Sequence, residues 1–419
     1  MHQPQLIPHL FRTEFRKITA VLTSLFGIEH IEAAEDIASD TFLLAIETWP
    51  YKGIPENPTG WLYTVAKNKA RNFIQRNNIL QKKIVPEIKK QSTDIEETEI
   101  DLSEQNITDS QLKMMFAICH PSIPVESQIG LALRILCGFG IEEIADAFLT
   151  NKETINKRLF RAREKLRQEN IRIEFPPPAE MEKRLDSVLT TLYLLFSEGY
   201  YSESSSEILR EDLCEEAMRL NLQLIENEQT NLPEVNALMS LMCFHSSRFA
   251  ARKDEKGEII LYRDQDESLW NWELISKGAY YLNQASTGNR LSNYHLEAGI
   301  AYWHTKKEDS REKWENILQL YNRLLQINYS PIAALNRTYA LSKVYGKEKA
   351  IKDAEKLKLT NNHFYFLLLG ELYMDIDSIK SKEHFQQALE MTKTDTEKRT
   401  IQLQIDRLIN THMITGFFK

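Results

Sequence analysis

The chain has 419 residues, enough for two to four domains, and 42% of them are hydrophobic, enough for packed cores. Glycine and proline are scarce, at 14 and 13, and alternating apolar runs are few, so the composition predicts an all-helical protein. The net charge is −8, and residues 1–170 hold 21 Lys and Arg against 23 Asp and Glu. These charges exclude a basic protein that binds nucleic acid over its whole surface. Any DNA affinity must come from local clusters of cations.

Two helices are predicted first, over residues 10–26 and 31–49, and Gly27 ends the first of them. Their apolar residues recur at helical spacing. The core positions are Phe11, Phe15, Ile18, Leu22 and Leu25 in the first helix, and Ile31, Ala34, Ala38, Phe42 and Ala45 in the second. The second helix also carries a second apolar stripe, Ile37 and Leu44, which is flanked by Asp36, Asp40, Leu43 and Glu47. A helix with two apolar faces either lies inside a bundle or presents one face to a partner, and the spacing alone leaves both open.

A third helix is predicted to follow Asn57 and Pro58, a cap followed by a proline at the first helical position. Leu62, Ala66, Ala70 and Phe73 suit its core. Its remaining surface combines aromatic, amide and cationic side chains, which can hold unstacked bases: Trp61, Tyr63, Asn68, Arg71, Asn72 and Arg76. The alternative is a helix with two core aromatics and a solvated polar face, and the residues in isolation favour that alternative.

Residues 77–108 read as a linker. Six acids and no cation lie between residues 94 and 104, a composition that predicts an extended segment: Asp94, Glu96, Glu97, Glu99, Asp101 and Glu104. A second, stiff spacer is predicted at Pro176, Pro177 and Pro178. These spacers give predicted domains at 1–78, 109–175, 179–290 and 291–419, with the acidic linker at 79–108.

Residues 140–167 have the pattern of a helix-turn-helix. Ile141, Ile144, Ala145 and Phe148 share one face of a short helix, and Thr150 with Glu153 is typical of a capping box. The next helix buries Ile155, Leu159, Ala162 and Leu166. Its other faces carry seven cations, and a helix in the major groove needs short polar or forked side chains early and cations along its length. The predicted DNA-contacting residues are Lys152, Glu153, Thr154, Asn156, Lys157, Arg158, Arg161 and Lys165.

The C-terminal part shows a 34-residue register, the period of tetratricopeptide repeats. The register pairs Ile332 with Phe366, Leu335 with Leu369, Asn336 with Gly370, Tyr339 with Tyr373, Ile351 with Phe385, and Ala354 with Ala388. Such helix pairs stack into a solenoid that binds peptides. An ordinary helical bundle with accidental spacing is the alternative.

The order of these blocks resembles an extracytoplasmic-function sigma factor. AEDIASDTFLLAIETWP (34–50) is similar to the helix that binds core RNA polymerase, and ENPTGWLYTVAKNKARNFIQR (56–76) to the segment that melts and reads the minus-ten element. Residues 124–167 resemble the domain that reads the minus-thirty-five element. The resemblance implies a cytoplasmic protein with core RNA polymerase and promoter DNA as partners.

Four further motifs resemble the subgroup of these factors with a long helical, tetratricopeptide-like extension: FAICHPSIP (116–124), LYLLFSEGYY (192–201), REDLCEEAMRL (210–220) and DQDESLWNWELI (264–275). The extension is expected to regulate the factor through a soluble protein or an intramolecular contact. Residues 192–201 and 264–275 have no evident physical role in the sequence.

Other functions lack their sequence signals. No window approaches 18 uninterrupted apolar residues, and the N-terminus lacks a signal-peptide pattern. Cys119-His120 and Cys243-x-His245 have no second pair at zinc spacing, and no phosphate-binding glycine loop or nucleophile motif occurs, so we expect no metal, no cofactor and no enzymatic activity. Two alternative functions are kept: a helix-turn-helix regulator that acts without polymerase, and a tetratricopeptide-like scaffold.

Overall fold

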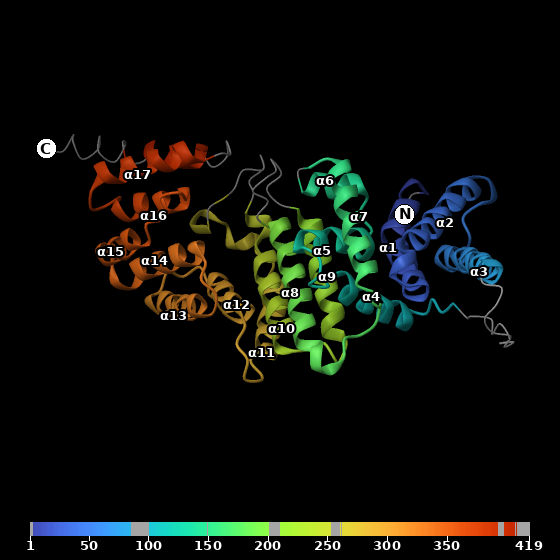
Figure 1. Cartoon of the computed structure of the whole chain (residues 1–419). Coiled ribbons are helices and arrows are strands. Elements are labelled where there is room, and N and C mark those ends of the chain that lie inside the picture. Colours follow the sequence, from blue (N-terminus) through green and yellow to red (C-terminus); the bar gives the residue numbers. More distant parts are fainter. Residues whose placement is uncertain are drawn as a thin grey trace. The chain divides into compact units, whose positions relative to one another are not determined.

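The computed structural model describes residues 3–84, 100–148, 150–200, 210–252, 260, 262–392, 398–406 and 408. These residues form helices joined by turns and contain no strand, which confirms the predicted all-helical class (Figure 1). None of their helices combines the length and apolar character that a membrane crossing requires. The chain divides into two compact units, residues 1–226 and 227–419, called here the first and second unit.

The first unit contains nine α-helices among its described residues. They are α1 (Gln3–Phe26), α2 (Ile31–Lys52), α3 (Pro58–Ile84), α4 (Glu104–Ile118), α5 (Val125–Leu131), α6 (Ile141–Ala147), α7 (Lys152–Gln168), α8 (Pro178–Tyr200) and α9 (Glu211–Glu226). A π-helical turn, Ala132–Leu136, continues α5.

Helices α1 to α3 pack around one core at the predicted spacing. The buried residues include Phe15, Ile18 and Leu22 of α1, five predicted positions of α2, and Leu62, Ala66 and Ala70 of α3. Leu25 is exposed, so the predicted stripe of α1 ends one turn early. Gly27 ends α1 with φ at 89°, a left-handed conformation that a side chain would strain.

The helix-turn-helix is present as α6 and α7. Ile155, Leu159, Ala162 and Leu166 are all buried, as the spacing predicted. The predicted cap at Thr150 is wrong by one residue. Asn151 is the N-cap, and its side chain accepts a 2.8 Å hydrogen bond from the Thr154 backbone N–H. An asparagine oxygen caps a helix as well as a threonine hydroxyl, so sequence alone did not separate the two.

The acidic linker is shorter than predicted at both ends, because α3 continues to Ile84 and α4 begins at Glu104. Ile100 and Leu102 are buried in the core of α1–α3, which fixes the end of the linker against that core. The Ser103 side chain caps α4 by accepting from the Asn106 N–H. The predicted acids Asp94, Glu96, Glu97 and Glu99 lie outside the described residues.

The predicted boundary at the three prolines does not separate the compact units. Helix α8 completes the hydrogen bonding of α4 and α5: Arg184 and Ser187 donate to the carbonyls of Phe116 and Cys119, at 2.5 and 2.7 Å. Thr191 donates to the Gln128 side chain at 2.7 Å. Arg219 of α9 donates to the Leu136 carbonyl, also at 2.7 Å. The first two helices of the predicted extension therefore belong structurally to the first unit.

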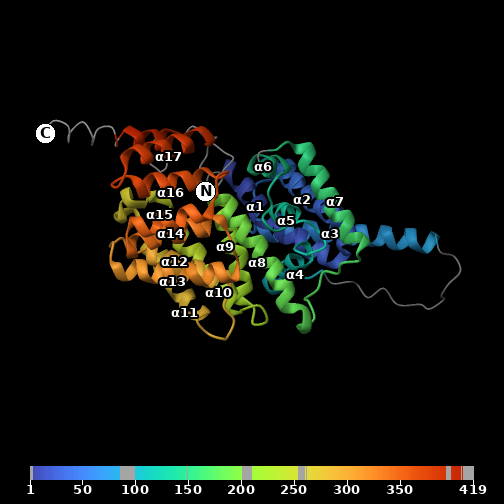
Figure 2. The ribbon, with the colours of Figure 1, turned by 60° about the vertical axis from the view of Figure 1, so that its left-hand side comes forward.

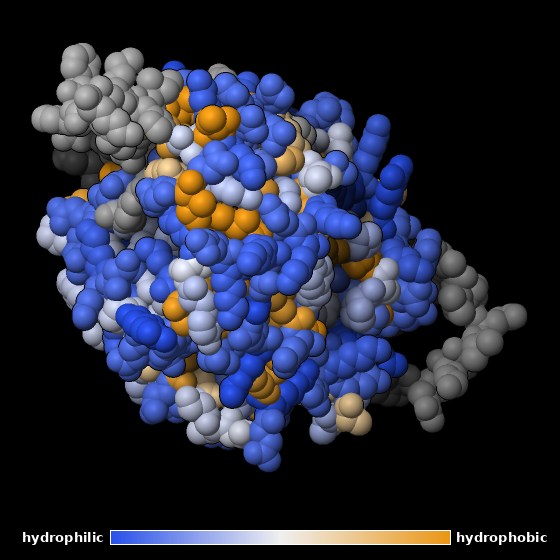
Figure 3. Space-filling view, turned by 90° about the vertical axis from the view of Figure 1, so that its left-hand side faces the viewer, coloured by the Kyte–Doolittle hydropathy of each residue, from blue (hydrophilic) through white to orange (hydrophobic). Residues whose placement is uncertain are grey.

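The second unit is built from α10 (Pro233–Ser246), α11 (Trp272–Ala285), α12 (Asn293–His304), α13 (Arg311–Ile327), α14 (Pro331–Tyr345), α15 (Lys347–Leu357), α16 (His363–Tyr373) and α17 (Ser378–Met391). Helix α10 is buried along nearly its whole length and packs against α11 and α12. Three short 3₁₀ turns, Phe249–Ala251, Tyr262–Asp264 and Glu267–Leu269, occur between α10 and α11. One face of the molecule, seen in Figure 3, is largely hydrophilic with small hydrophobic patches.

Helices α12 to α17 form three consecutive pairs, and α13 to α17 each pack on the helix before them (Figure 2). Several positions of the 34-residue register are buried in equivalent places, namely Leu335 with Leu369, and Ala354 with Ala388. Gly370 is required where it stands, because a Cβ there would lie 2.7 Å from the Phe385 ring. Its register partner Asn336 is exposed, so the periodicity is imperfect there.

Candidate nucleic-acid interface

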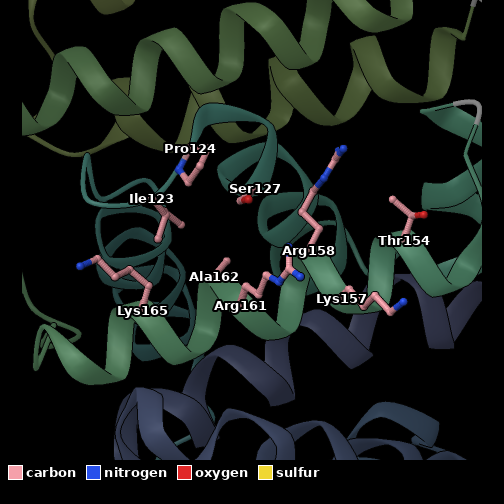
Figure 4. A pocket seen from close by; sticks show the side chains of 9 residues that line it. All are labelled: Ile123, Pro124, Ser127, Thr154, Lys157, Arg158, Arg161, Ala162 and Lys165. Carbon is pink, nitrogen blue, oxygen red and sulfur yellow. The ribbon is translucent and has the colours of Figure 1, made fainter.

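A groove of about 410 Å³ runs along α7, between this helix and the turn that leads into α5 (Figure 4). Its lining residues are Ile123, Pro124, Ser127, Thr154, Lys157, Arg158, Arg161, Ala162 and Lys165. Five of these belong to the predicted DNA-contacting set. The helix-turn-helix packing therefore gathers these residues on one side of α7, around a concave surface.

Three cations of this groove have no acidic partner within the part of the chain that the structure describes. Lys157 and Arg161 are exposed, and the Arg158 guanidinium lies 5.5 Å from the Phe148 ring centre. Lys165 is paired with Glu169 at 2.5 Å, and Lys152 with Glu142. Glu153, Thr154 and Asn156 are exposed on the first turns of the helix. The groove side of α7 thus presents positive charge that no carboxylate of the described residues neutralises.

The other side of α7 is neutralised by α2. Arg163 donates to Glu35 at 2.9 Å, and Arg134 reaches the other oxygen of the same carboxylate, also at 2.9 Å. Arg167 pairs with Glu32. The side chains of Arg163 and Glu35 are only 12% and 9% exposed. The sequence shows seven cations on this helix but not which of them are paired with acids and which can meet DNA. That difference depends on where α2 packs against α7.

The predicted base-holding residues of α3 are split between core and surface. Trp61 is half-buried and its ring lies 5.5 Å from that of Trp49, edge to face. Tyr63 is also half-buried, and its hydroxyl donates to Glu14 at 2.6 Å. Burial and this hydrogen bond raise the pKa of Tyr63 well above its ordinary value.

The polar members of the set are exposed on the outer face of α3: Asn68, Arg71, Asn72 and Arg76. The later part of this helix extends beyond α1 and α2 in Figure 2. Both aromatics pack partly against the core, as the alternative interpretation expected, while the amides and cations are free to meet a ligand.

The second stripe of α2 is a mixed apolar and acidic surface. Asp36, Asp40, Leu43 and Glu47 are exposed, Leu44 is half-buried, and Asp40 pairs with Lys69 at 3.1 Å. Ile37 is wrongly placed in the prediction, because it faces the core of α1–α3. Ile46 and Tyr51 are exposed instead and extend the apolar part of the surface. Ile46 follows Leu43 by three residues, so a helical stripe drawn through Leu43 would have found it.

No group of three or more His, Cys, Asp or Glu side chains is placed to hold a metal among the described residues. All four cysteines are buried, and none forms a disulfide among the described residues. Burial raises the pKa of the Cys119 and Cys243 thiols to about 12.

Comparisons with known proteins agree with this arrangement. An uncharacterized protein of Rhizobium meliloti (strain 1021) is 30% identical over 387 residues, which cover 90% of each chain, so the two belong to one family. Residues 10–79 match the family model of sigma-70 region 2. The chain is a sigma-70 family factor. A family of unknown function (DUF6596) matches residues 184–286, and no solved structure matches the chain.

The sigma-70 region 2 match coincides with the core that α1 to α3 form. The region-2 match covers these helices, including the acidic surface of α2 and the outer face of α3. It supports a role in transcription initiation, with core RNA polymerase and promoter DNA as partners. The DUF6596 match begins inside α8 of the first unit and ends just after α11 of the second.

Proposed function

We propose that the chain is a sigma factor of the extracytoplasmic-function type that directs core RNA polymerase to specific promoters, opens them, and acts in the cytoplasm. The observation that carries this proposal is the α7 groove, where Lys157, Arg158 and Arg161 lie without acidic partners among the described residues on the second helix of a helix-turn-helix. The region-2 match supports a polymerase-dependent function rather than a free regulator.

Helix α7 is proposed to read the minus-thirty-five element. Glu153, Thr154, Lys157 and Arg158 lie early enough to meet base edges, while Arg161 and Lys165 meet phosphates. Lys152 and Asn156 complete this surface. The pairing of Arg163 and Arg167 with α2 supports the assignment, because it leaves the groove side as the part of α7 available to DNA.

Helix α3 is proposed to melt and hold the minus-ten element. Its exposed residues Asn68, Arg71, Asn72 and Arg76 would meet bases and phosphates. Trp61 and Tyr63 offer ring surface only where they are not packed on the core, so base stacking there uses the exposed part of each ring.

The exposed surface of α2 is proposed to bind core polymerase. Leu43, Ile46 and Tyr51 give it apolar area, and Asp36 and Glu47 give it negative charge. Exposed apolar area bordered by charge is typical of a protein interface.

The experiment is transcription in vitro with core polymerase, full-length protein and genome fragments, with start sites mapped. Asp36→Arg with Leu43→Arg should abolish both co-purification with core polymerase and specific starts, and should leave helical content and duplex binding unchanged. Glu215→Arg, an exposed acid of α9 outside the three proposed surfaces, is the matched control. Duplex binding without any specific start, for the native protein, would favour a regulator that acts without polymerase.

We further propose that the second unit is a regulatory module with tetratricopeptide-like helix pairs, controlled by a soluble partner or by an intramolecular contact. The three helix pairs and their shared buried positions support this. A chain ending at Glu226 keeps α8 and α9 and should still bind core polymerase, with lower initiation. A chain ending at Pro178 would uncover α4 and α5, so loss of folding is expected there. Native initiation by the chain ending at Glu226, under every condition, would remove the regulatory role.

A further inference from the structure

Two cations of the second unit are buried and have no carboxylate partner in the part of the chain that the structure describes. Arg248, which follows α10, is 9% exposed, and Lys313, in the first turn of α13, is 1% exposed. Neither forms an ion pair with a carboxylate of the described residues. Taking a charge out of water is costly, and native proteins almost always pair a buried charge or bind an ion with it.

Both cations lie against the same ring. The Arg248 guanidinium carbon is 5.4 Å from the centre of Tyr262, and the Lys313 Nζ is 5.1 Å from it. Lys313 also donates to the Tyr262 hydroxyl at 3.0 Å and to the Lys306 carbonyl. These contacts orient the two side chains. A neutral hydroxyl, a carbonyl and a ring face do not replace the negative charge that a buried cation needs.

Burial and the nearby cations disfavour the charged form of two neighbouring histidines. His304 contacts the Tyr262 ring edge to face at 5.2 Å, and burial, with Arg248 and Lys313 nearby, lowers the pKa of His304 to about 3. Burial and three neighbouring basic groups lower the pKa of His245 well below its ordinary value.

Two acids, Asp309 and Glu267, act on Lys313 through their charge, and neither forms an ion pair with it in the described residues. Asp309 accepts from the Trp314 ring N–H and from Lys343 at 3.0 Å, and it influences Lys313 only from a distance. Glu267 is exposed. The positive charge of Arg248 and Lys313 therefore remains largely uncompensated within the described residues.

Three buried polar atoms near Tyr262 also have no hydrogen-bond partner among the described residues: Arg248 Nε, Gln265 Oε1 and Trp270 Nε1. Trp270 stacks on Tyr262 with ring centres 6.4 Å apart, and Gln265 lies between them in sequence. Two of the three atoms are N–H donors, which are the groups that hold an oxyanion. Gln265 and Trp270 belong to the motif at residues 264–275, to which the sequence assigned no role.

We infer that Arg248, Lys313 and the Trp270 ring N–H form a site for a small oxyanion, a carboxylate or a phosphate, in the second unit. The bound anion supplies the missing negative charge and accepts the unused N–H groups. The site does not depend on the proposed promoter function, since it consists only of residues of the second unit. It gives that unit a way to sense a small acidic molecule.

The test is thermal unfolding of the full-length protein in sodium phosphate, in sodium acetate and in sodium chloride, at equal ionic strength and pH. A saturable rise of about 2–4 °C, absent in chloride, is expected in phosphate or in acetate, and the active salt identifies the source. Arg248→Met and Lys313→Met should each raise the unfolding temperature without anion and remove the response. Lys349→Met is the control, because Lys349 is an exposed cation of the same unit that lies 4.0 Å from the centre of a different ring, Tyr345; it should keep the response.

Two results would overturn the inference. One is the absence of a saturable response to either anion together with a lower unfolding temperature for Arg248→Met, which would make that cation structural. The other concerns residues 253–259, which lie outside the described residues and include Asp254, Glu255 and Glu258. If replacing these acids by their amides creates an anion response that the native protein lacks, the chain itself supplies the negative charge.

Discussion

The two units bury positive charge in opposite ways. In the first unit, Arg134 and Arg163 share the carboxylate of Glu35, with both contacts at 2.9 Å. In the second unit, Arg248 and Lys313 are at least as well buried, and they share only the neutral ring of Tyr262. The first arrangement holds two helices together. The second has no such partner in the described residues, which is why we assign it to a ligand.

The exposed cations of α7 form a third group. Lys157, Arg158 and Arg161 have no acidic partner among the described residues, like the two cations of the second unit. Lys157 and Arg161 are exposed and Arg158 is half-buried, so water solvates them at little cost. Burial and pairing together therefore separate three roles on one molecule: packing, binding of a small anion, and binding of DNA. Removing single charges tests each role with a different readout.

The largest effect is expected for Glu35→Gln. This change leaves Arg134 and Arg163 without their shared negative charge, while the side chain keeps its size. The free energy of unfolding should fall by about 2–3 kcal/mol, somewhat less than for a fully buried pair because the Arg134 side chain is 20% exposed. Urea unfolding of the full-length protein measures the change.

The control for that change is Glu169→Gln, which breaks the exposed pair with Lys165 and should lower the free energy of unfolding far less, because water screens an exposed pair. An equal loss in the two variants would show that the cluster between α2 and α7 contributes no more than a surface pair. The contrast with the second unit is direct, because Arg248→Met should change stability in the opposite direction.

These clusters show what could be predicted from the sequence. The apolar spacing located α1 to α3, α6 and α7 and most of their core positions, because helical periodicity is a local property. The pairing of Arg163 with Glu35 joins residues 128 positions apart and left no local signal. For the same reason Ile37 was assigned to the surface, and α8 and α9 were assigned to a separate domain.

The next largest effect is expected for Arg158→Ala, and it concerns DNA rather than stability. The side chain is partly exposed over Phe148, so unfolding should change by no more than about 0.5 kcal/mol. Binding to the preferred upstream element should weaken by about 1–3 kcal/mol, and one base preference should relax. Fluorescence anisotropy with a panel of single-base promoter variants measures both. A uniform loss over the whole panel would reassign Arg158 to a phosphate.

Trp61→Ala separates a role in packing from a role in DNA binding for an aromatic side chain that packs partly on the core and is proposed to stack on a base. A stacked base is worth about 1–3 kcal/mol, so open-complex formation should fall roughly tenfold or more. The ring also contacts Trp49, and some stability will be lost. A promoter with a pre-melted bubble should partly restore the variant, whereas a loss confined to stability would make Trp61 a core residue only. Trp49→Phe, which alters the packing partner and keeps Trp61, is the control.

Lys165→Ala should have the smallest effect, because this cation is already shared with Glu169 in the free protein. To contact a DNA phosphate, Lys165 must break its pair with Glu169. The favourable energy of the phosphate contact is therefore partly offset by the loss of that pair. Binding should weaken by less than about 1 kcal/mol for every promoter variant alike, and the slope of log affinity against log salt should fall by about one unit or less. Arg161→Ala is the matched comparison, since Arg161 has no acidic partner among the described residues, and it should lose more affinity. If Lys165→Ala loses as much DNA affinity as Arg161→Ala, the pair with Glu169 does not reduce what Lys165 contributes to DNA binding. Pairing would then not distinguish the roles of the cations on the surface of α7.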